Sequence, residues 1–199
     1  MRVVLASGNR SKLVELRRIL EGLDVELVPM LEFDLEGAEE TGDTFEENAL
    51  IKARAVAAAT GLPALADDSG LEVDALGGAP GVHSARYAGI ETDDIANNRK
   101  LREELAAIPE QERTARFVCV AALVTPDGRE WTERGTMEGR IVDEPRGEGG
   151  FGYDPLFVSE GETRTNAELS PEEKDARSHR GEAFRAIRDD VARLAGEGS

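Results

Sequence analysis

The chain has 199 residues, 40% of them hydrophobic, a size that suits one compact domain or two closely fused lobes. Its 41 acidic residues outnumber its 24 basic ones, and the resulting net charge of −17 argues against a dedicated DNA or RNA binder. No apolar run approaches the roughly 18 residues of a membrane span, and we expect a cytoplasmic protein. The single cysteine, Cys119, excludes an internal disulfide and a cysteine-based zinc site.

Strands and helices alternate in the first half of the chain. Residues 3–6 and 25–30 form short apolar runs that predict strands, and leucines at helical spacing predict a helix between them: Leu13, Leu16, Leu20 and Leu23. A capping box that begins at Thr44 predicts a second helix, which we expect to end at Gly61. Residues 62–66 then predict a short buried strand that ends at an acidic pair. This alternation predicts an α/β sheet with a ligand at its strand ends.

The second half of the chain shows another pattern. Residues 77–89 are glycine-rich and predict an ordered loop, whereas residues 92–107 predict a helix. Residues 116–124 and 129–138 flank a Pro-Asp-Gly turn and predict an antiparallel hairpin, which we expect to form a second lobe. The last predicted helix has one apolar face, formed by Phe184, Ile187, Val191 and Leu194. Because no repeat or linker interrupts the sequence, we expect a single domain over residues 1–199.

A polar loop from Ser7 to Lys12 lies between the first predicted strand and the N-terminus of a predicted helix. Free backbone N–H groups and the helix dipole favour anions at such a position. Gly8 lets a ligand approach the backbone, Asn9 tolerates turn conformations, and Lys12 supplies a positive charge for a phosphate. The G-x-x-x-x-G-K-[ST] pattern is absent, so this is not a Walker A loop. A plain polar turn is the alternative.

Carboxylates at two places are candidates for a magnesium site. Asp67 and Asp68 follow an apolar strand, where ligand sites in open α/β sheets gather, whereas Glu40 and the glutamate before it would also suit a solvated surface. Mg²⁺ takes one or two carboxylates and completes its octahedron with phosphates and water. Asn48 and Lys52 stand one helical turn apart, so they either direct an amide and a cation at these carboxylates or form a solvated helix face.

Two further segments carry groups suited to a nucleotide base. Glycines surround the aromatic residues of the segment 149–155, which frees the backbone to approach a ligand and offers a ring for stacking. A tight turn with core aromatics would have the same sequence pattern. Lys174, His179 and Arg180 supply hydrogen-bond donors for a base or for phosphate, although a lone histidine is more often structural.

Five stretches, taken in order, resemble the inosine triphosphate pyrophosphatase family, the non-canonical purine nucleoside triphosphate pyrophosphatases. They are SGNRSK at 7–12, EETGDTFEENALIKA at 39–53, ADDSGLEVDALGGAPGVHSARYAG at 66–89, GGFGYDPLF at 149–157 and AELSPEEKDARSHRGEA at 167–183. The resemblance implies an elongated, two-lobed α/β fold with a mixed sheet, flanking helices and a central active-site cleft, and usually a homodimer. It also implies hydrolysis of ITP, dITP and XTP to the nucleoside monophosphate and pyrophosphate.

The resemblance assigns roles to matching positions of this chain. Glu40 and Asp68 would hold Mg²⁺, Asp68 would accept a proton from the attacking water, and Ser69 would touch the substrate. We expect Lys52 to help offset the charge of the triphosphate. The triphosphate would be bound by Ser7, Gly8, Asn9, Arg10, Ser11 and Lys12. The base and sugar would be enclosed by Phe151, Gly152, Tyr153, Asp154, Lys174, His179 and Arg180.

Two other functions fit the same residues. A Maf-type pyrophosphatase would act on other modified nucleotides, and a substrate panel separates it from the family above. A nucleotide-binding module that does not hydrolyse its ligand would have less need of an acidic array around a water molecule, and binding without turnover would favour it.

Overall fold

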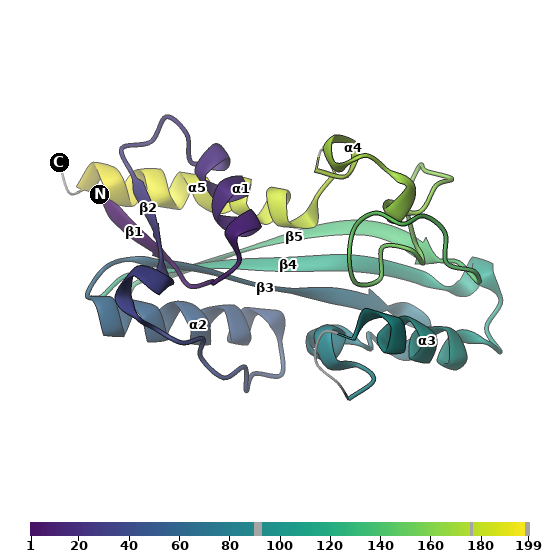
Figure 1. Ribbon diagram of the computed structural model, residues 1–199. Coiled ribbons are helices and arrows are strands. Elements are labelled where there is room, and N and C mark those ends of the chain that lie inside the picture. Colours follow the sequence, from purple (N-terminus) through teal and green to yellow (C-terminus); the bar gives the residue numbers. More distant parts are fainter. Residues whose placement is uncertain (90–92, 176, 198–199) are drawn as a thin grey trace. The chain divides into compact units, whose positions relative to one another are not determined.

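The computed structural model describes residues 1–89, 93–175 and 177–197, and its strands form one mixed sheet (Figure 1). The strand order is β2-β1-β3-β4-β5-β6. β1 pairs in parallel with β2 and β3, whereas β5 and β6 are antiparallel. The strands are β1 (Arg2–Leu5), β2 (Glu26–Pro29), β3 (Ala64–Val73), β4 (Thr114–Val124), β5 (Glu130–Ile141) and β6 (Phe157–Ser159). The predicted mixed α/β architecture is confirmed.

Five α-helices accompany the sheet in the described ranges: α1 (Arg10–Ile19), α2 (Phe45–Thr60), α3 (Asp94–Leu105), α4 (Pro171–Asp175) and α5 (His179–Glu197). Short 3-10 helices lie at Met30–Phe33, Asp74–Leu76, Gly81–Arg86, Glu110–Glu112 and Asn166–Glu168. None of the helices described is long and apolar enough to cross a membrane.

The chain forms two compact units. Unit 1 comprises Met1–Asp68, Cys119–Gly135 and Arg180–Ser199, and unit 2 comprises Ser69–Val118 and Thr136–His179. Strands β3, β4 and β5 therefore contribute residues to both units. The predicted hairpin of β4 and β5 forms, but its turn belongs to unit 1, so the hairpin as a whole is not a second lobe.

Unit 1 has helices on both faces of its strands (Figure 1). Leu5 and Leu65 share a buried core with Leu16 of α1 and with Phe184 of α5. All four residues of the predicted apolar face of α5 are buried. Because successive side chains of a strand point to opposite faces, the neighbours of Leu5 and Leu65 are buried on the other side, where α2 lies.

The acidic pair lies inside a strand and not after one, which corrects our prediction of a strand over residues 62–66. β3 begins at Ala64 and continues through Asp67 and Asp68 to Val73. The exposed fractions of these two aspartates are only 3% and 9%. A buried carboxylate without a partner would destabilise a strand. Here Lys12 pairs with Asp67, and Lys52 pairs with Asp68.

Unit 2 has a separate core beneath α3, which includes Leu71, Val73, Leu101, Leu105 and Phe157. Helix α3 is shorter than predicted, because Asp93 caps it by accepting a hydrogen bond from the Ala96 N–H at 2.9 Å. Thr92, the expected first residue of that helix, lies outside the described residues. The predicted loop 77–89 contains the 3-10 helix Gly81–Arg86.

Candidate functional site

The loop before α1 is held by its own polar side chains. The Ser7 hydroxyl accepts a hydrogen bond from the Asn9 N–H at 3.1 Å, and Asn9 Oδ1 accepts one from the Lys12 N–H at 3.3 Å. Nothing lies within 4 Å of where a Cβ would stand on Gly8, so a ligand has room to approach the backbone there. Arg10 is exposed at the start of α1, and the side chain of Ser11 lies outside the described part of the structure.

Lys12 turns from this loop to a buried carboxylate. Its ammonium lies 2.8 Å from both Oδ1 and Oδ2 of Asp67. Arg180 lies at the start of α5, and its Nε is 3.4 Å from Asp67 Oδ2. Burial alone would raise the pKa of Asp67, but the Lys12 and Arg180 charges outweigh it and hold this pKa well below its usual range. Asp67 therefore stays ionised and keeps two cations beside the loop.

A second charged group in unit 1 is centred on Lys52. Its ammonium lies 2.7 Å from Glu40 Oε1 and 3.0 Å from Asp68 Oδ1. Burial alone would lower the pKa of Lys52, but the two carboxylates outweigh it and raise this pKa. The pKa of Asp68 is raised, mainly by burial and further by the Glu40 charge, against the opposing effect of Lys52. Together with Lys12, Asp67 and Arg180, these three residues form what we call the carboxylate–cation cluster.

Helix α2 positions both Lys52 and the segment that carries Glu40. The predicted capping box is confirmed: Thr44 Oγ1 accepts from the Glu47 N–H at 3.1 Å, and Glu47 Oε2 accepts from the Thr44 N–H at 3.1 Å. One turn into the helix, the buried Asn48 Oδ1 accepts a hydrogen bond from the Gly42 N–H at 2.8 Å. Asn48 thus anchors the approach to α2, and Lys52, one turn further on, faces the carboxylates, which is one of the two alternatives that the sequence left open.

Glu40 and Asp68 fit the requirements of a hard divalent cation. Both place a carboxylate oxygen within 3.0 Å of the same ammonium nitrogen, so they already converge on one positive charge. A cluster of three or more His, Cys, Asp or Glu side chains arranged for a metal does not occur among the described residues. Two carboxylates agree with Mg²⁺, which takes much of its shell from phosphate and water, better than with a metal held by protein ligands alone.

Unit 2 holds a second group, the aromatic–carboxylate cluster, formed by Phe151, Asp154, Asn166 and Lys174. Asp154 is buried, accepts a hydrogen bond from the Phe151 N–H at 2.8 Å, and pairs with the Lys174 ammonium. Asn166 Nδ2 lies 3.4 Å from the other oxygen of Asp154. The Lys174 ammonium is 4.4 Å from the centre of the Phe151 ring. The 65% exposed ring of Phe151 therefore stands beside a fixed cation.

Local sequence explains how Phe151 and Lys174 reach these places. Gly150 has φ +72°, and a Cβ there would overlap the Asp154 carboxylate, so only glycine lets the loop close over it. The Ser170 hydroxyl accepts a hydrogen bond from the Glu173 N–H at 3.2 Å, and Glu173 Oε2 accepts one from the Ser170 N–H at 2.9 Å, which together form a capping box. This box starts α4 and sets the position of Lys174.

The remaining predicted residues have diverse surroundings. His179 stacks on Phe117, with ring centres 5.2 Å apart and planes 14° from parallel. Tyr153 is buried and donates to the Ser84 carbonyl at 2.9 Å, so its ring belongs to the core of unit 2. Ser69 is partly exposed on β3. The three predicted donors thus divide: Lys174 and His179 belong to unit 2, whereas Arg180 binds Asp67 in unit 1.

Sequence reasoning named Asp67 only as a candidate for the magnesium site, and it assigned no role to Asn166 or to Phe117, which stacks on His179. Asp67 was noticed as half of an acidic pair, but its two cations come from 55 and 113 residues away. Phe117 has the appearance of an ordinary strand residue, and Asn166 lies in a segment without a motif. No pattern within one stretch of sequence signals such contacts.

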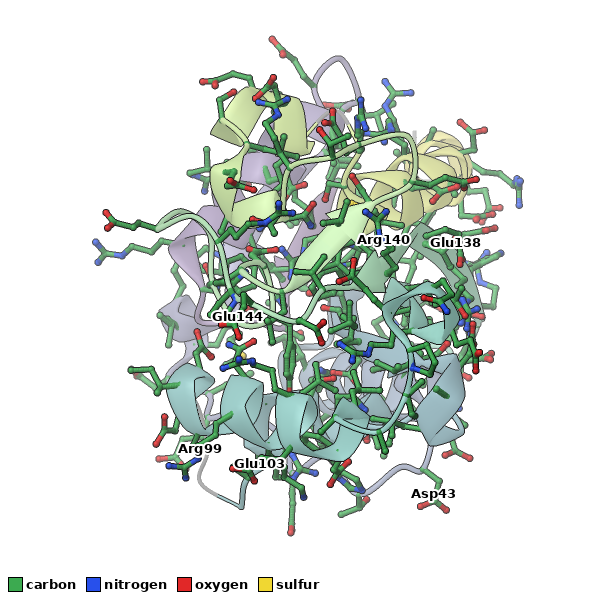
Figure 2. All side chains as sticks on the ribbon, turned by 90° about the vertical axis from the view of Figure 1, so that its right-hand side faces the viewer. Asp43, Arg99, Glu103, Glu138, Arg140 and Glu144 are labelled. Atoms are coloured by element: carbon green, nitrogen blue, oxygen red, sulfur yellow. The ribbon has the colours of Figure 1, made fainter. Side chains whose placement is uncertain are left out.

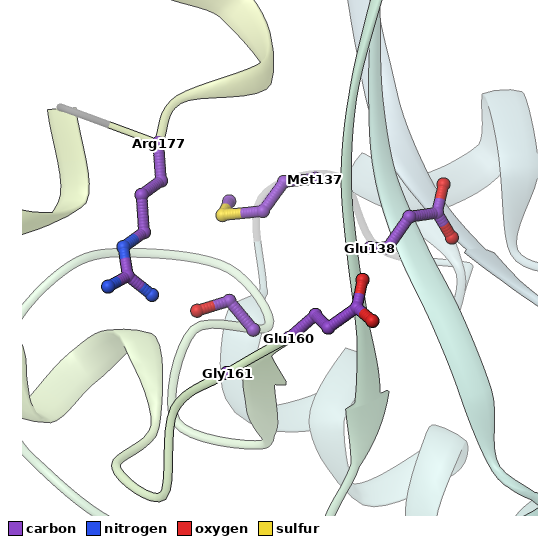
Figure 3. A pocket seen from close by; sticks show the side chains of 6 residues that line it. Met137, Glu138, Glu160, Gly161 and Arg177 are labelled. Atoms are coloured by element: carbon purple, nitrogen blue, oxygen red, sulfur yellow. The ribbon is translucent and has the colours of Figure 1, made fainter.

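A hollow of about 410 Å³ lies elsewhere in unit 2 (Figure 3). It is lined by Met137, Glu138, Ser159, Glu160, Gly161 and Arg177. Met137 and Arg177 lie on opposite sides of it, whereas the Glu138 side chain points away. The residues that line the hollow include none of the site residues predicted from the sequence. Its nearest link to the aromatic–carboxylate cluster is the 3.9 Å contact between Asn166 Nδ2 and the Met137 sulfur.

The fold and the carboxylate–cation cluster define an α/β protein equipped for a phosphorylated ligand and a divalent cation. The chain belongs to the Ham1 family, whose model matches residues 3–190. It is 59% identical to a dITP/XTP pyrophosphatase of Frankia alni, over 94% of this chain and 95% of the relative. A dITP/XTP pyrophosphatase of Cutibacterium acnes is 57% identical, over 94% of each chain. The structure of a HAM1 protein from Coxiella burnetii superposes with a TM-score of 0.92, at 47% identity, over 97% of this chain and 99% of that one.

Proposed function

We propose that the protein hydrolyses non-canonical purine nucleoside triphosphates, ITP, dITP and XTP, to the nucleoside monophosphate and pyrophosphate. The observation that carries this proposal is the convergence of Glu40 and Asp68 on Lys52, in the same unit as Lys12 and Arg180. Carboxylates for a metal and cations for phosphates are the two requirements of phosphoryl transfer. The relatives named above support the same activity and substrate class.

In this reaction a water oxygen forms a bond to the α-phosphorus, and the bond from that phosphorus to the bridging oxygen of the β-phosphate breaks. Asp68, whose Oδ1 lies 3.0 Å from the Lys52 ammonium, accepts the proton of the water. Glu40 and Asp68 would hold Mg²⁺, which when bound offsets the charge of the phosphates and of the leaving pyrophosphate. Lys12 and the Ser7–Lys12 loop bind phosphate oxygens through the ammonium and the backbone N–H groups.

The aromatic–carboxylate cluster serves base recognition in this proposal. The exposed ring of Phe151 offers a stacking surface, and Lys174 beside it offers a donor. A donor suits the 6-oxo group of hypoxanthine and xanthine but faces another donor in the 6-amino group of adenine. A buried donor left without an acceptor lowers the specificity constant by a factor on the order of 10³ or more. The homodimer stays a prediction from the resemblance, and the cytoplasmic location stays a prediction from the sequence.

The test of the proposed function is pyrophosphate release from ITP, XTP, GTP, ATP and dTTP, each with and without Mg²⁺. We expect fast, metal-dependent release from ITP and XTP and little from GTP or ATP. Preference for dTTP or another pyrimidine would favour the Maf-type alternative. Tight ITP binding without any product would favour the non-hydrolysing module.

Asp68→Asn tests the assigned proton acceptor. Because the amide is nearly the same size but does not accept a proton from water, we expect turnover of ITP to fall by a factor of ~10² or more. Asp43→Asn is the matched control, since Asp43 is exposed and projects from the surface (Figure 2). Near-normal turnover by a folded Asp68→Asn protein would remove Asp68 from the mechanism.

A further inference from the structure

The loop that carries Phe151 is held from outside by the first turns of helix α3. The Gly152 N–H donates to Asp94 Oδ2 at 2.7 Å. The Gly152 carbonyl accepts from Asn98 Nδ2 at 2.8 Å. Asn98 Nδ2 also donates to the Asp94 carbonyl at 2.8 Å, so the two helix residues are tied to each other. Both backbone polar groups of one residue are thus bound by two side chains one helical turn apart, an arrangement that we call the Gly152 clamp.

The same loop is held on its inner side by Asp154, which accepts from the Phe151 N–H at 2.8 Å. Gly152 has φ +60°, a conformation that glycine adopts readily. Because glycine has no Cβ, it can also move to other conformations easily. The exposed ring of Phe151 has little packing of its own to fix it. Its backbone is therefore fixed by hydrogen bonds at Phe151 on one side and at Gly152 on the other.

We propose that Asp94 and Asn98 are positioning residues for base recognition, because the Gly152 clamp holds Phe151 ready to stack on the base. This inference rests on the proposed function, in which Phe151 contacts the base. A stacking ring that is already ordered loses less conformational freedom when the ligand binds, so the clamp strengthens binding of the base without touching it. The phosphates bind residues of unit 1, so the clamp leaves their binding unchanged.

Asn98→Ala removes one arm of the clamp without weakening the helix, since alanine has the highest helix propensity. We expect the KM for ITP to rise about threefold to tenfold, the scale of one net hydrogen bond, with kcat changed less than about twofold. The inhibition constant of tripolyphosphate, which has no base, should stay the same. Asn98→Asp keeps the size of the side chain but removes the donors, and it should behave like Asn98→Ala.

The matched control is Arg99→Ala on the next residue of α3. Arg99 is exposed, and its side chain pairs with Glu103 on the outer surface of the same helix (Figure 2). Hydrogen–deuterium exchange of peptides that cover residues 149–156 provides a readout that does not depend on activity. We expect faster exchange there in Asn98→Ala and in Asp94→Ala, no change in Arg99→Ala, and unchanged exchange in α5 of all three proteins.

The failure of this inference and the failure of the proposed function give different results. If the wild-type protein releases pyrophosphate from ITP, and the Asn98 variants match Arg99→Ala in KM and in exchange, the clamp has no positioning role. An equal rise in the KM for ITP and in the inhibition constant of tripolyphosphate would likewise overturn it. If the wild-type protein does not hydrolyse ITP, the proposed function fails, and so does the base-recognition role, even where exchange shows that the clamp orders the loop.

Discussion

Charged side chains have very different energetic weight depending on their burial. Exposed pairs such as Arg99 with Glu103 contribute between about 0 and 1 kcal/mol, because water and salt screen them. Asp67 is different, since 1% of its side chain is exposed while Lys12 and Arg180 remain 19% and 16% exposed. Taking one partner from such a group leaves uncompensated charges away from water, so the loss is much larger than the net value of the pair.

Asp67→Asn tests this difference at the scale of one residue. The amide keeps the shape but leaves two cations close together without a counter-charge. We expect the free energy of unfolding to fall by about 3 kcal/mol, measured by urea denaturation at neutral pH. Asp43→Asn, at an exposed position, should change it by less than about 0.5 kcal/mol. A loss from Asp67→Asn no larger than that of the control would show that the Lys12 and Arg180 pairs contribute little to stability.

At the scale of an element, α2 connects a local sequence signal to the site. Its capping box, its C-terminal Gly61 at φ +66° and its buried Asn48 fix the helix that presents Lys52 to Glu40 and Asp68. The hydroxyl of Thr44 satisfies a backbone donor that the helix itself leaves unpaired.

Thr44→Ala removes this cap. We expect a loss of stability of about 1 kcal/mol, because the Glu47 N–H then depends on water. Thr44→Ser keeps the hydroxyl and should recover most of the loss, as measured by the midpoints of thermal unfolding of the three proteins. Equal destabilisation by serine and alanine would assign the effect to the lost methyl group and not to the cap.

Some helices and strands could be predicted from the sequence, and others could not. Capping boxes and apolar stripes are local, so the start of α2 could be predicted from its capping box and the buried face of α5 from its apolar stripe. The length of β3 could not, because burial of Asp67 depends on Arg180, 113 residues away. The Gly152 clamp was missed for a similar reason: Asp94 has the appearance of an ordinary residue in the first turn of a helix, and its partner Gly152 lies 58 residues further along the chain.

At the scale of the whole molecule, salt changes stability in two opposite ways, through the net charge and through the ion pairs. The chain carries a net charge of −17, whose self-repulsion opposes the compact state. Salt screens this repulsion and thereby stabilises the fold, but it also screens the exposed ion pairs. Each exposed pair contributes little, and buried pairs such as Lys12 with Asp67 are screened less, so the net charge should dominate.

We therefore expect the Tm to rise when NaCl increases from about 0.01 to 0.15 M. The Debye length falls from roughly 30 to 8 Å over this range, so the added salt screens the repulsion between negative charges. If the repulsion relieved is about 1 kcal/mol, the Tm rises by roughly 2–4 °C for a protein of this size. The measurement is thermal unfolding by circular dichroism in a buffer without divalent cations, so that occupation of the Glu40 and Asp68 site does not contribute. A variant in which two exposed aspartates, Asp43 and Asp189, are replaced by asparagine provides the control (Figure 2 labels Asp43). Its net charge is smaller, so its Tm should depend less on salt. A Tm that falls with salt would show instead that the ion pairs outweigh the net charge.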